Sequence, residues 1–141
     1  MRIFLDANIL VSVLNKEYPL YSITSRILSI SDRKDFLLYS SPVCLAIAFY
    51  FAEKKFRSNK AKSKIQLLCE HIQITSVNES AVTKTLQNPA VNDFEDGLEY
   101  YSAVENQCDC IITEDIHDFY FSKIEVLRSE DFFKKYMLKN N

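Results

Sequence analysis

The feature that most constrains the fold of this chain is an alternation of short apolar segments with segments of helical spacing. The apolar segments are four or five residues long and lie at residues 2–5, 36–40, 72–76, 110–113 and 124–127. Between them, apolar residues recur every three or four positions, which is typical of a helix with one buried face. Strands that alternate with helices predict a mostly parallel sheet covered on both faces. The predicted fold class is therefore α/β.

The expected helices cover residues 7–15, 19–32, 42–56, 60–71, 80–86, 93–106 and 129–136. Ser41, Ser80 and Ser129 are expected to cap three of them, because a serine hydroxyl accepts from the free N–H groups of a first turn. In the helix at 93–106, Phe94 and Leu98 are expected to face the core. No repeat or linker interrupts the 141 residues, so we expect one domain over residues 1–141.

The composition excludes several classes of site. Gly97 is the one glycine of the chain, so neither a P-loop nor a dinucleotide-binding fingerprint can be written with this sequence. His71 and His117 are far apart and form no helical histidine pair, which excludes the motif of a zinc protease. The four cysteines lack the spacing of a zinc knuckle and are interpreted as reduced, mostly buried thiols.

The hydrophobic residues make up 48% of the chain and the charged residues 26%, as in an ordinary globular domain. No apolar run approaches the ~18–20 residues that a membrane span requires. The apolar stretch before Asp6 is too short for a signal peptide. We therefore expect a cytoplasmic protein with no membrane association.

The charges of the chain are unevenly distributed. Lys and Arg total 17 and Asp and Glu total 19, so the net charge is −2. The segment 85–122 nevertheless contains neither Lys nor Arg. It contains nine acids: Asp93, Glu95, Asp96, Glu99, Glu105, Asp109, Glu114, Asp115 and Asp118. For most of these acids, a solvated acidic surface is the simplest interpretation.

Three acids are placed so that they converge. Asp6 follows the first strand directly, and Asp115 lies two residues beyond the strand at 110–113. Asp96 lies one turn into the helix at 93–106. Ligands of parallel α/β sheets bind beyond the carboxyl ends of the strands. Three carboxylates without a nearby Lys or Arg require a cation, and oxygen ligands suit Mg²⁺ or Mn²⁺. This is the chemistry of a metal-dependent nuclease.

Three segments resemble the PIN-domain family. Residues 5–10 (Leu-Asp-Ala-Asn-Ile-Leu) resemble its opening, and residues 93–98 (Asp-Phe-Glu-Asp-Gly-Leu) resemble the segment of its third acid. Residues 111–115 (Ile-Ile-Thr-Glu-Asp), followed by Asp118 and Phe119, resemble its strand-end motif. The resemblance implies a three-layer α/β/α sandwich and a ribonuclease dependent on Mg²⁺ or Mn²⁺. It also implies the toxin of a toxin–antitoxin pair, with an RNA substrate, a cognate antitoxin and a homodimer.

The same resemblance assigns roles to individual residues. It implies that Asp6, Asp96 and Asp115 are catalytic and bind the metal. Asn8 and Thr113 would orient these ligands by hydrogen bonding. Asp93, three residues before Asp96, would share its helical face and serve as a further ligand.

One family acid is missing. The resemblance places a second acid, a Glu, near Ala46, but no acid occurs before Glu53. This gap motivates an alternative, a non-catalytic PIN-like module that binds RNA or protein. A third hypothesis is a phosphotransferase with Asp6 as nucleophile. That chemistry usually needs an acid–base group two residues later, where Asn8 cannot exchange a proton.

A basic stretch follows the helix at 42–56. Its first four members are Lys54, Lys55, Arg57 and Lys60. Such a run can contact RNA phosphates, each contact adding salt-dependent affinity, or it can be a solvated helix end. The sequence favours neither interpretation.

Overall fold

The centre of the structure is a parallel sheet. The computed structural model describes residues 1–138, so the predicted domain end at residue 141 lies outside the described residues. Its strands, in the spatial order β3-β2-β1-β4-β5, are β1 (Arg2–Leu5), β2 (Leu37–Ser40), β3 (Gln73–Ile74), β4 (Cys110–Ile112) and β5 (Glu125–Leu127). Each of the four strand pairings is parallel. The predicted fold class is confirmed.

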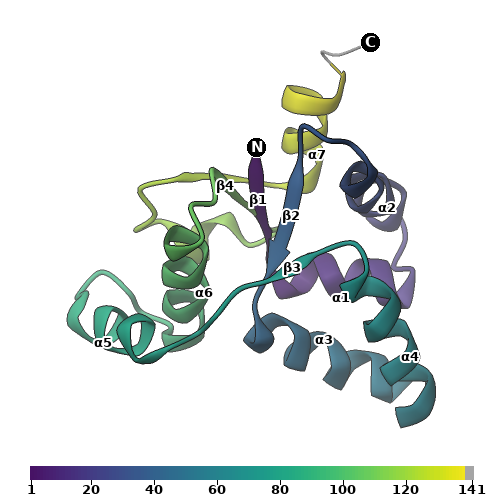
Figure 1. The fold of residues 1–141 in the computed structure, drawn as a ribbon, viewed down its shortest axis with the longest axis horizontal. Helices are drawn as coiled ribbons and strands as arrows, with labels where there is room; N and C mark the ends of the chain where they lie inside the picture. Colours follow the sequence, from purple (N-terminus) through teal and green to yellow (C-terminus); the bar gives the residue numbers. More distant parts are fainter. Residues whose placement is uncertain (139–141) are drawn as a thin grey trace.

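Helices cover both faces of this sheet (Figure 1). On one side lie α5 (Glu79–Gln87) and α6 (Phe94–Glu105), which pack against each other. On the other side lie α1 (Ala7–Asn15), α2 (Tyr21–Ser29), α3 (Pro42–Lys55) and α4 (Ser58–Cys69). The short α7 (Ser129–Phe132) packs against α2. Shorter turns are the 3₁₀ helices at Ile30–Asp32 and Ile116–Phe119 and the π-helical turn Phe133–Met137.

The two central strands are the most deeply buried part of the chain. Ile3, Phe4 and Leu5 of β1 and every residue of β4 are buried. Strands that are covered on both faces need apolar side chains at consecutive positions. This requirement explains why both strands read as continuous apolar runs, and why polar residues appear only where the strands end.

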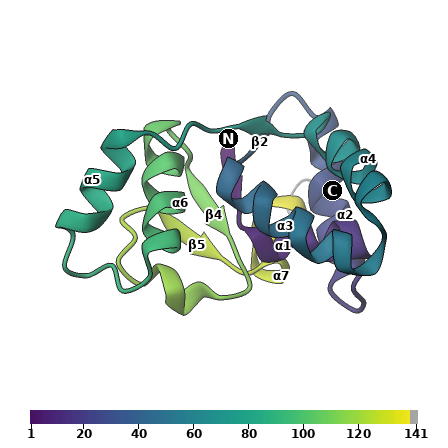
Figure 2. The same ribbon diagram turned by 90° about the horizontal axis from the view of Figure 1, so that it is seen from below.

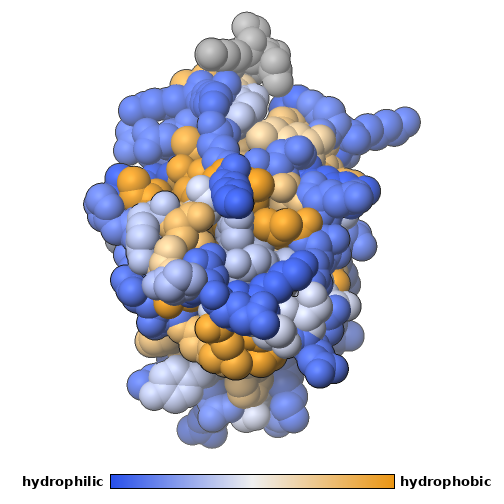
Figure 3. Space-filling model, turned by 90° about the vertical axis from the view of Figure 1, so that its left-hand side faces the viewer, coloured by the Kyte–Doolittle hydropathy of each residue, from blue (hydrophilic) through white to orange (hydrophobic). Residues whose placement is uncertain are grey.

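The face of α6 differs from the prediction. Phe94 was expected in the core but is exposed, as is Val104, whereas Leu98, Glu99, Ser102 and Ala103 are buried. Figure 3 shows the α5–α6 side of the molecule, where apolar areas lie among hydrophilic ones. The helix is thus rotated from the orientation that its largest apolar residues suggest, and it buries a carboxylate instead.

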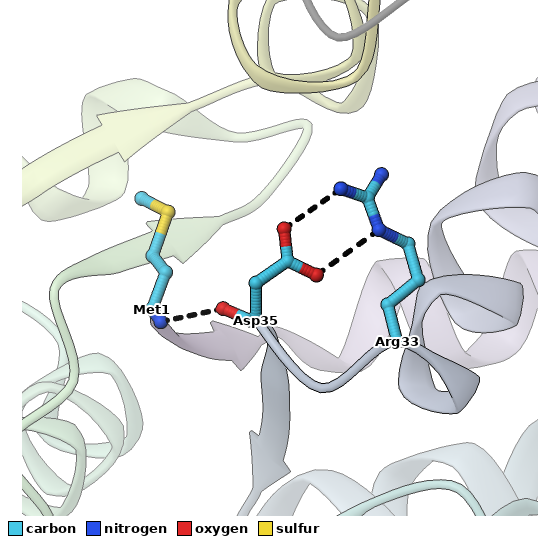
Figure 4. A network of polar contacts seen from close by, with 3 residues as sticks. All are labelled: Met1, Arg33 and Asp35. Carbon is cyan, nitrogen blue, oxygen red and sulfur yellow. Dashed lines mark hydrogen bonds and ion pairs between the residues drawn. The ribbon is translucent and has the colours of Figure 1, made fainter.

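A polar contact secures the amino end of β1 (Figure 4). The terminal ammonium of Met1 donates to the carbonyl oxygen of Asp35 at 2.7 Å. Arg33 donates from Nε and Nη2 to the two carboxylate oxygens of Asp35, at 3.1 and 2.7 Å. The Arg33 guanidinium lowers the pKa of that exposed carboxyl. This network stands before β1, at the opposite end from Asp6.

Two predicted caps are wrong. Asn78, not Ser80, caps α5, with its side chain accepting from the N–H of Ala81 at 3.1 Å. Ser129 lies inside α7, where its backbone N–H and its hydroxyl both donate to Glu114. Ser41 does cap α3, accepting from the N–H of Cys44. None of the helices within residues 1–138 has the length and apolar character needed to cross a membrane.

Candidate metal centre

Asp6 stands at the junction of β1 and α1. Its backbone N–H donates to the carbonyl of Ile112 in β4 at 3.0 Å, and its side chain caps α1. The N–H of Ala7 donates to Oδ1 at 2.6 Å, and the hydroxyl of Thr113 donates to Oδ2 at 2.7 Å. Asp6 is 7% exposed. Its carboxylate is therefore fixed by donors from two elements while one edge remains accessible.

Asn8 links Asp6 to Asp115. Its Nδ2 donates to Thr113 Oγ1 at 3.1 Å, to Asp115 Oδ2 at 3.3 Å and, more weakly, to Asp6 Oδ2 at 3.5 Å. Its Oδ1 accepts from the N–H of Glu114 at 3.2 Å. The side chains of Asn8 and Thr113 thus contact the carboxylates that the sequence analysis assigned to them.

Asp96 reaches the site from α6, whose approach to α5 depends on Gly97. A Cβ at Gly97 would stand 2.3 Å from Thr85 Cγ2 and 2.8 Å from Val91 Cγ1. No side chain larger than hydrogen fits at this distance without rearrangement. The single glycine of the chain therefore allows the close helix packing that places its neighbour, Asp96, beside Asp6.

Asp93 has a different position from the one expected. It precedes α6 as the N-cap, and its Oδ1 accepts from the N–H groups of Glu95 and Asp96 at 2.9 and 3.3 Å. Because it lies outside the helix, the argument that it shares a helical face with Asp96 does not apply. Its role as a metal ligand stays a prediction.

The acids meet in a cavity of about 370 Å³ at the carboxyl end of the sheet. Figure 2 views this end, with α6 on one side and α1 and α3 on the other. Among the described residues, no Lys or Arg lines the cavity. Six carboxylates do: Asp6, Glu17, Glu95, Asp96, Asp115 and Asp118.

The crowding of these carboxylates changes their affinity for protons. Burial raises the pKa of Asp96 to about 7, with further contributions from the charges of Asp93, Asp118, Asp6 and Glu95. Burial also raises the pKa of Asp118, with the charge of Asp115 adding to it. A cation in the cavity would relieve this repulsion.

Sequence reasoning missed Glu99. This residue of α6 is fully buried, and neither of its carboxylate oxygens has a hydrogen-bond partner among the described residues. Burial raises its pKa well above the usual range, and the charges of Cys44 and Asp6 add to the effect. Burial likewise raises the pKa of the Cys44 thiol to about 11. The sequence held a sign of this burial: Ser102 and Ala103 follow Glu99 by one helical turn, so the three residues share a face, and small residues on that face indicate close packing.

The helix expected to carry the second acid presents an apolar residue instead. Ile47 of α3 lines the cavity, whereas Ala46 is exposed and lies outside its lining. Glu53 is exposed farther along α3. Of these two neighbouring residues, Ile47 and not Ala46 therefore faces the cavity, and neither offers a carboxylate.

The basic residues lie at the far end of α3 and in α4. Lys55 donates to the carbonyl of Asn15 at the end of α1. Lys54 lies over the ring of Tyr50, 4.2 Å from its centroid, and Lys60 over that of Phe56 at 4.8 Å. Arg57 precedes α4. Lys55 therefore has a structural contact, while RNA binding by all four stays a prediction.

Comparison with known proteins identifies the family. Residues 2–117 match the family model described as PIN domain. The chain belongs to the PIN-domain family. The family predicted from the three motifs is thereby confirmed. Among curated proteins, none matches the sequence.

Solved structures share the fold. One is VapBC2 from Rickettsia felis, bound to a DNA fragment from their promoter, with a TM-score of 0.68, 18% identity, and 91% of this chain and 98% of that chain covered. A second is VapBC-1 from nontypeable Haemophilus influenzae, with a TM-score of 0.67 and 17% identity. The match covers 92% of this chain and 99% of that chain. A third is VapC20 from Mycobacterium tuberculosis, described as a sarcin-ricin loop cleaving toxin, with a TM-score of 0.66 and 11% identity. The match covers 87% of this chain and 98% of that chain. At these identities, the likeness establishes the fold.

Proposed function

We propose that this PIN-domain protein is an endoribonuclease that depends on Mg²⁺ or Mn²⁺ and serves as the toxin of a toxin–antitoxin pair. The observation that carries the proposal is the convergence of Asp6, Asp96 and Asp115 on one cavity that no Lys or Arg of the described residues lines. The described cleavage of the sarcin-ricin loop by a structural relative supports RNA as the substrate.

The donor set fits a hard divalent cation. Asp6, Asp96 and Asp115 would bind it, with Asp93 as a further predicted ligand, and all four offer carboxylate oxygens. When bound, such a cation activates water and neutralises charge on a phosphodiester.

The residues of the chain prepare this site. Thr113 and Ala7 donate to the two oxygens of Asp6 and fix its orientation. Asn8 holds Asp115 at a set distance from Asp6. Ile47 and Phe51 give the cavity an apolar wall, which suits the sugar or base beside a bound phosphate. Fixed ligands need no reorganisation at the moment of reaction.

The partners follow from the same proposal. The relatives solved as VapBC2 and VapBC-1 support a protein partner, the cognate antitoxin. A homodimer is proposed with it. A cytoplasmic location, where RNA and antitoxin meet, belongs to this proposal. Lys54 and Lys60 are proposed as contacts to RNA phosphates, with Lys55 and Arg57 beside them.

Cleavage of RNA by the purified protein tests the proposal. We expect cleavage with Mn²⁺ or Mg²⁺, its loss with EDTA, and a decrease of at least about 100-fold in Asp6→Asn and Asp115→Asn. The matched control is Asp32→Asn, which removes an exposed carboxylate outside the cavity. Unchanged cleavage in Asp6→Asn would refute the site.

A non-catalytic binding module is the second candidate, and it is favoured because neither Ala46 nor Ile47 of α3 offers a carboxylate. This candidate predicts RNA or protein binding without cleavage. Calorimetry that detects no Mn²⁺ binding at millimolar concentration would support it over the nuclease.

A further inference from the structure

We infer that Glu99 of α6 is a metal ligand that supplies the carboxylate missing from α3. This inference rests on the proposed metal centre and extends it to a residue outside the predicted ligand set. It adds a fifth carboxylate to the proposed ligands Asp6, Asp96, Asp115 and Asp93.

The first argument is the burial of Glu99 without a partner. Its side chain is 0% exposed, and both carboxylate oxygens lack a hydrogen-bond partner within residues 1–138. Buried polar groups in folded proteins nearly always have one. An ionised carboxylate without a partner is unfavourable in the interior, so such a group either keeps its proton or binds a cation. The polar neighbours of Glu99 include Asp6 and Cys44, and neither donates to its ionised carboxylate. A cation shared with Asp6 is the partner that this pair of carboxylates suits.

The second argument is geometry. One oxygen of Glu99, one oxygen of Asp6 and the sulfur of Cys44 all lie within 4.8 Å of one another. A second such group contains Glu95, Asp96 and Glu99. Glu99 is common to both groups, so its carboxylate lies within 4.8 Å of both Asp6 and Asp96. Oxygens that share a Mg²⁺ ion at about 2.1 Å stand roughly 3–4 Å apart, which small side-chain adjustments reach from this arrangement.

The third argument concerns the helix that lacks the expected acid. Cys44 and Ile47 are three positions apart on α3 and share one face. Glu99 crosses from α6 to meet Cys44 at this face, while Ile47 lines the cavity. Glu99 thus brings a carboxylate from α6 to the face of α3 that carries none. Cys44 of α3 also lies near Glu99, but its thiol is a soft ligand, whereas hard cations prefer the carboxylates of Glu99 and Asp6.

Metal binding, measured apart from RNA cleavage, tests the inference. Mn²⁺ titration of the full chain, followed by calorimetry and by the electron paramagnetic resonance of free Mn²⁺, gives the affinity directly. We expect Glu99→Gln and Glu99→Leu to weaken binding about 10- to 100-fold, as the loss of a group that serves a metal does. Glu105→Gln, which removes a carboxylate elsewhere on α6, should leave the affinity unchanged.

A rescue variant separates ligation from folding. In the Glu99→Gln background, Ile47→Glu restores an acid to α3, and we expect it to recover most of the lost affinity. Melting temperatures in EDTA show whether each variant is folded, and Glu99→Leu should melt no lower than the wild type because it replaces a buried polar group that has no hydrogen-bond partner among the described residues with an apolar one.

The outcomes distinguish this inference from the proposed function. Wild-type affinity in both Glu99 variants, together with RNA cleavage by the wild type, overturns the role of Glu99 alone. Metal binding that depends on Glu99 without RNA cleavage supports the ligand and contradicts the nuclease. A wild-type protein that binds no Mn²⁺ at millimolar concentration overturns both.

Discussion

The hydroxyl of Thr113 donates a 2.7 Å hydrogen bond to Asp6 Oδ2, joining the ends of the neighbouring strands β4 and β1. The same oxygen of Thr113 accepts from Asn8 and from the N–H of Asp115. A single buried hydroxyl therefore orients three residues around the cavity. Since these bonds all depend on Oγ1, its removal should affect the site more than the core.

Thr113→Val tests this arrangement. The variant keeps the shape of the side chain but removes the donor to Asp6 and the acceptor for Asn8 and Asp115. We expect a loss of about 1–3 kcal/mol in the free energy of unfolding, as for a buried hydrogen bond left unmade, and weaker Mn²⁺ binding. Urea unfolding and calorimetry measure the two effects. Thr113→Ser retains the hydroxyl, so equal Mn²⁺ affinities in the Val and Ser variants would contradict the role of Oγ1.

The pKa of Asp96 predicts how stability depends on pH without metal. Its value of about 7 in the folded protein lies above the ordinary 3.8, so the folded state binds this proton more tightly than the unfolded state. Stability in EDTA should therefore fall as the pH rises from about 4 to about 7 and level off above that value. Melting temperatures across this range, read against Asp96→Asn, measure the effect.

Asp96→Asn removes the repulsion, so the variant should melt higher than the wild type at pH 8 in EDTA and similarly at pH 4. Saturating Mn²⁺ should reverse the order at pH 8, because ligand binding stabilises the wild type by mass action. A wild type that gains stability from pH 5 to pH 7 more than Asp96→Asn does would refute the pKa assignment.

The part of the site that follows from the sequence is the part attached to strands. Asp6 and Asp115 come directly after apolar runs, and parallel strands bring their carboxyl ends to one edge. Helix-borne groups were harder to place, because apolar Phe94 is exposed and Glu99 is buried. A 3.6-residue period fixes which residues share a face, but not which face meets the sheet.

The sequence pattern also did not predict which side chains form hydrogen bonds with backbone groups at helix ends. Asp93, a predicted ligand, also caps α6, and Lys55, a predicted RNA contact, also donates to Asn15. Both roles depend on where a helix begins or ends, the boundary that periodicity determines least well. The apolar runs and the order of the elements depend on no such detail.

Gly97 offers a test of helix packing next to the site. Gly97→Ala places a Cβ 2.3 Å from Thr85 Cγ2, and Thr85 is held because its hydroxyl donates to Ala81 at 2.7 Å. We expect a net loss of about 1–2 kcal/mol, since overpacking costs about 1–3 kcal/mol and the helix propensity of Ala offsets part of it. Denaturant unfolding of the double variant Gly97→Ala/Thr85→Ala should show a smaller loss than the sum of the two single variants. Additive losses would contradict a direct clash.

The basic residues should divide into two groups on substitution. Lys55→Ala removes the cation at the carboxyl end of α1, where such charges stabilise a helix by about 0.5 kcal/mol, so its melting temperature should fall. Lys54→Ala and Lys60→Ala should leave that temperature nearly unchanged.

These two variants should instead each weaken RNA binding and reduce the slope of log affinity against log salt by about 1, as the loss of one phosphate contact does. Fluorescence anisotropy with a catalytically inactive Asp6→Asn background, at several salt concentrations, measures this slope. Equal slopes in all variants would place the RNA path away from the end of α3.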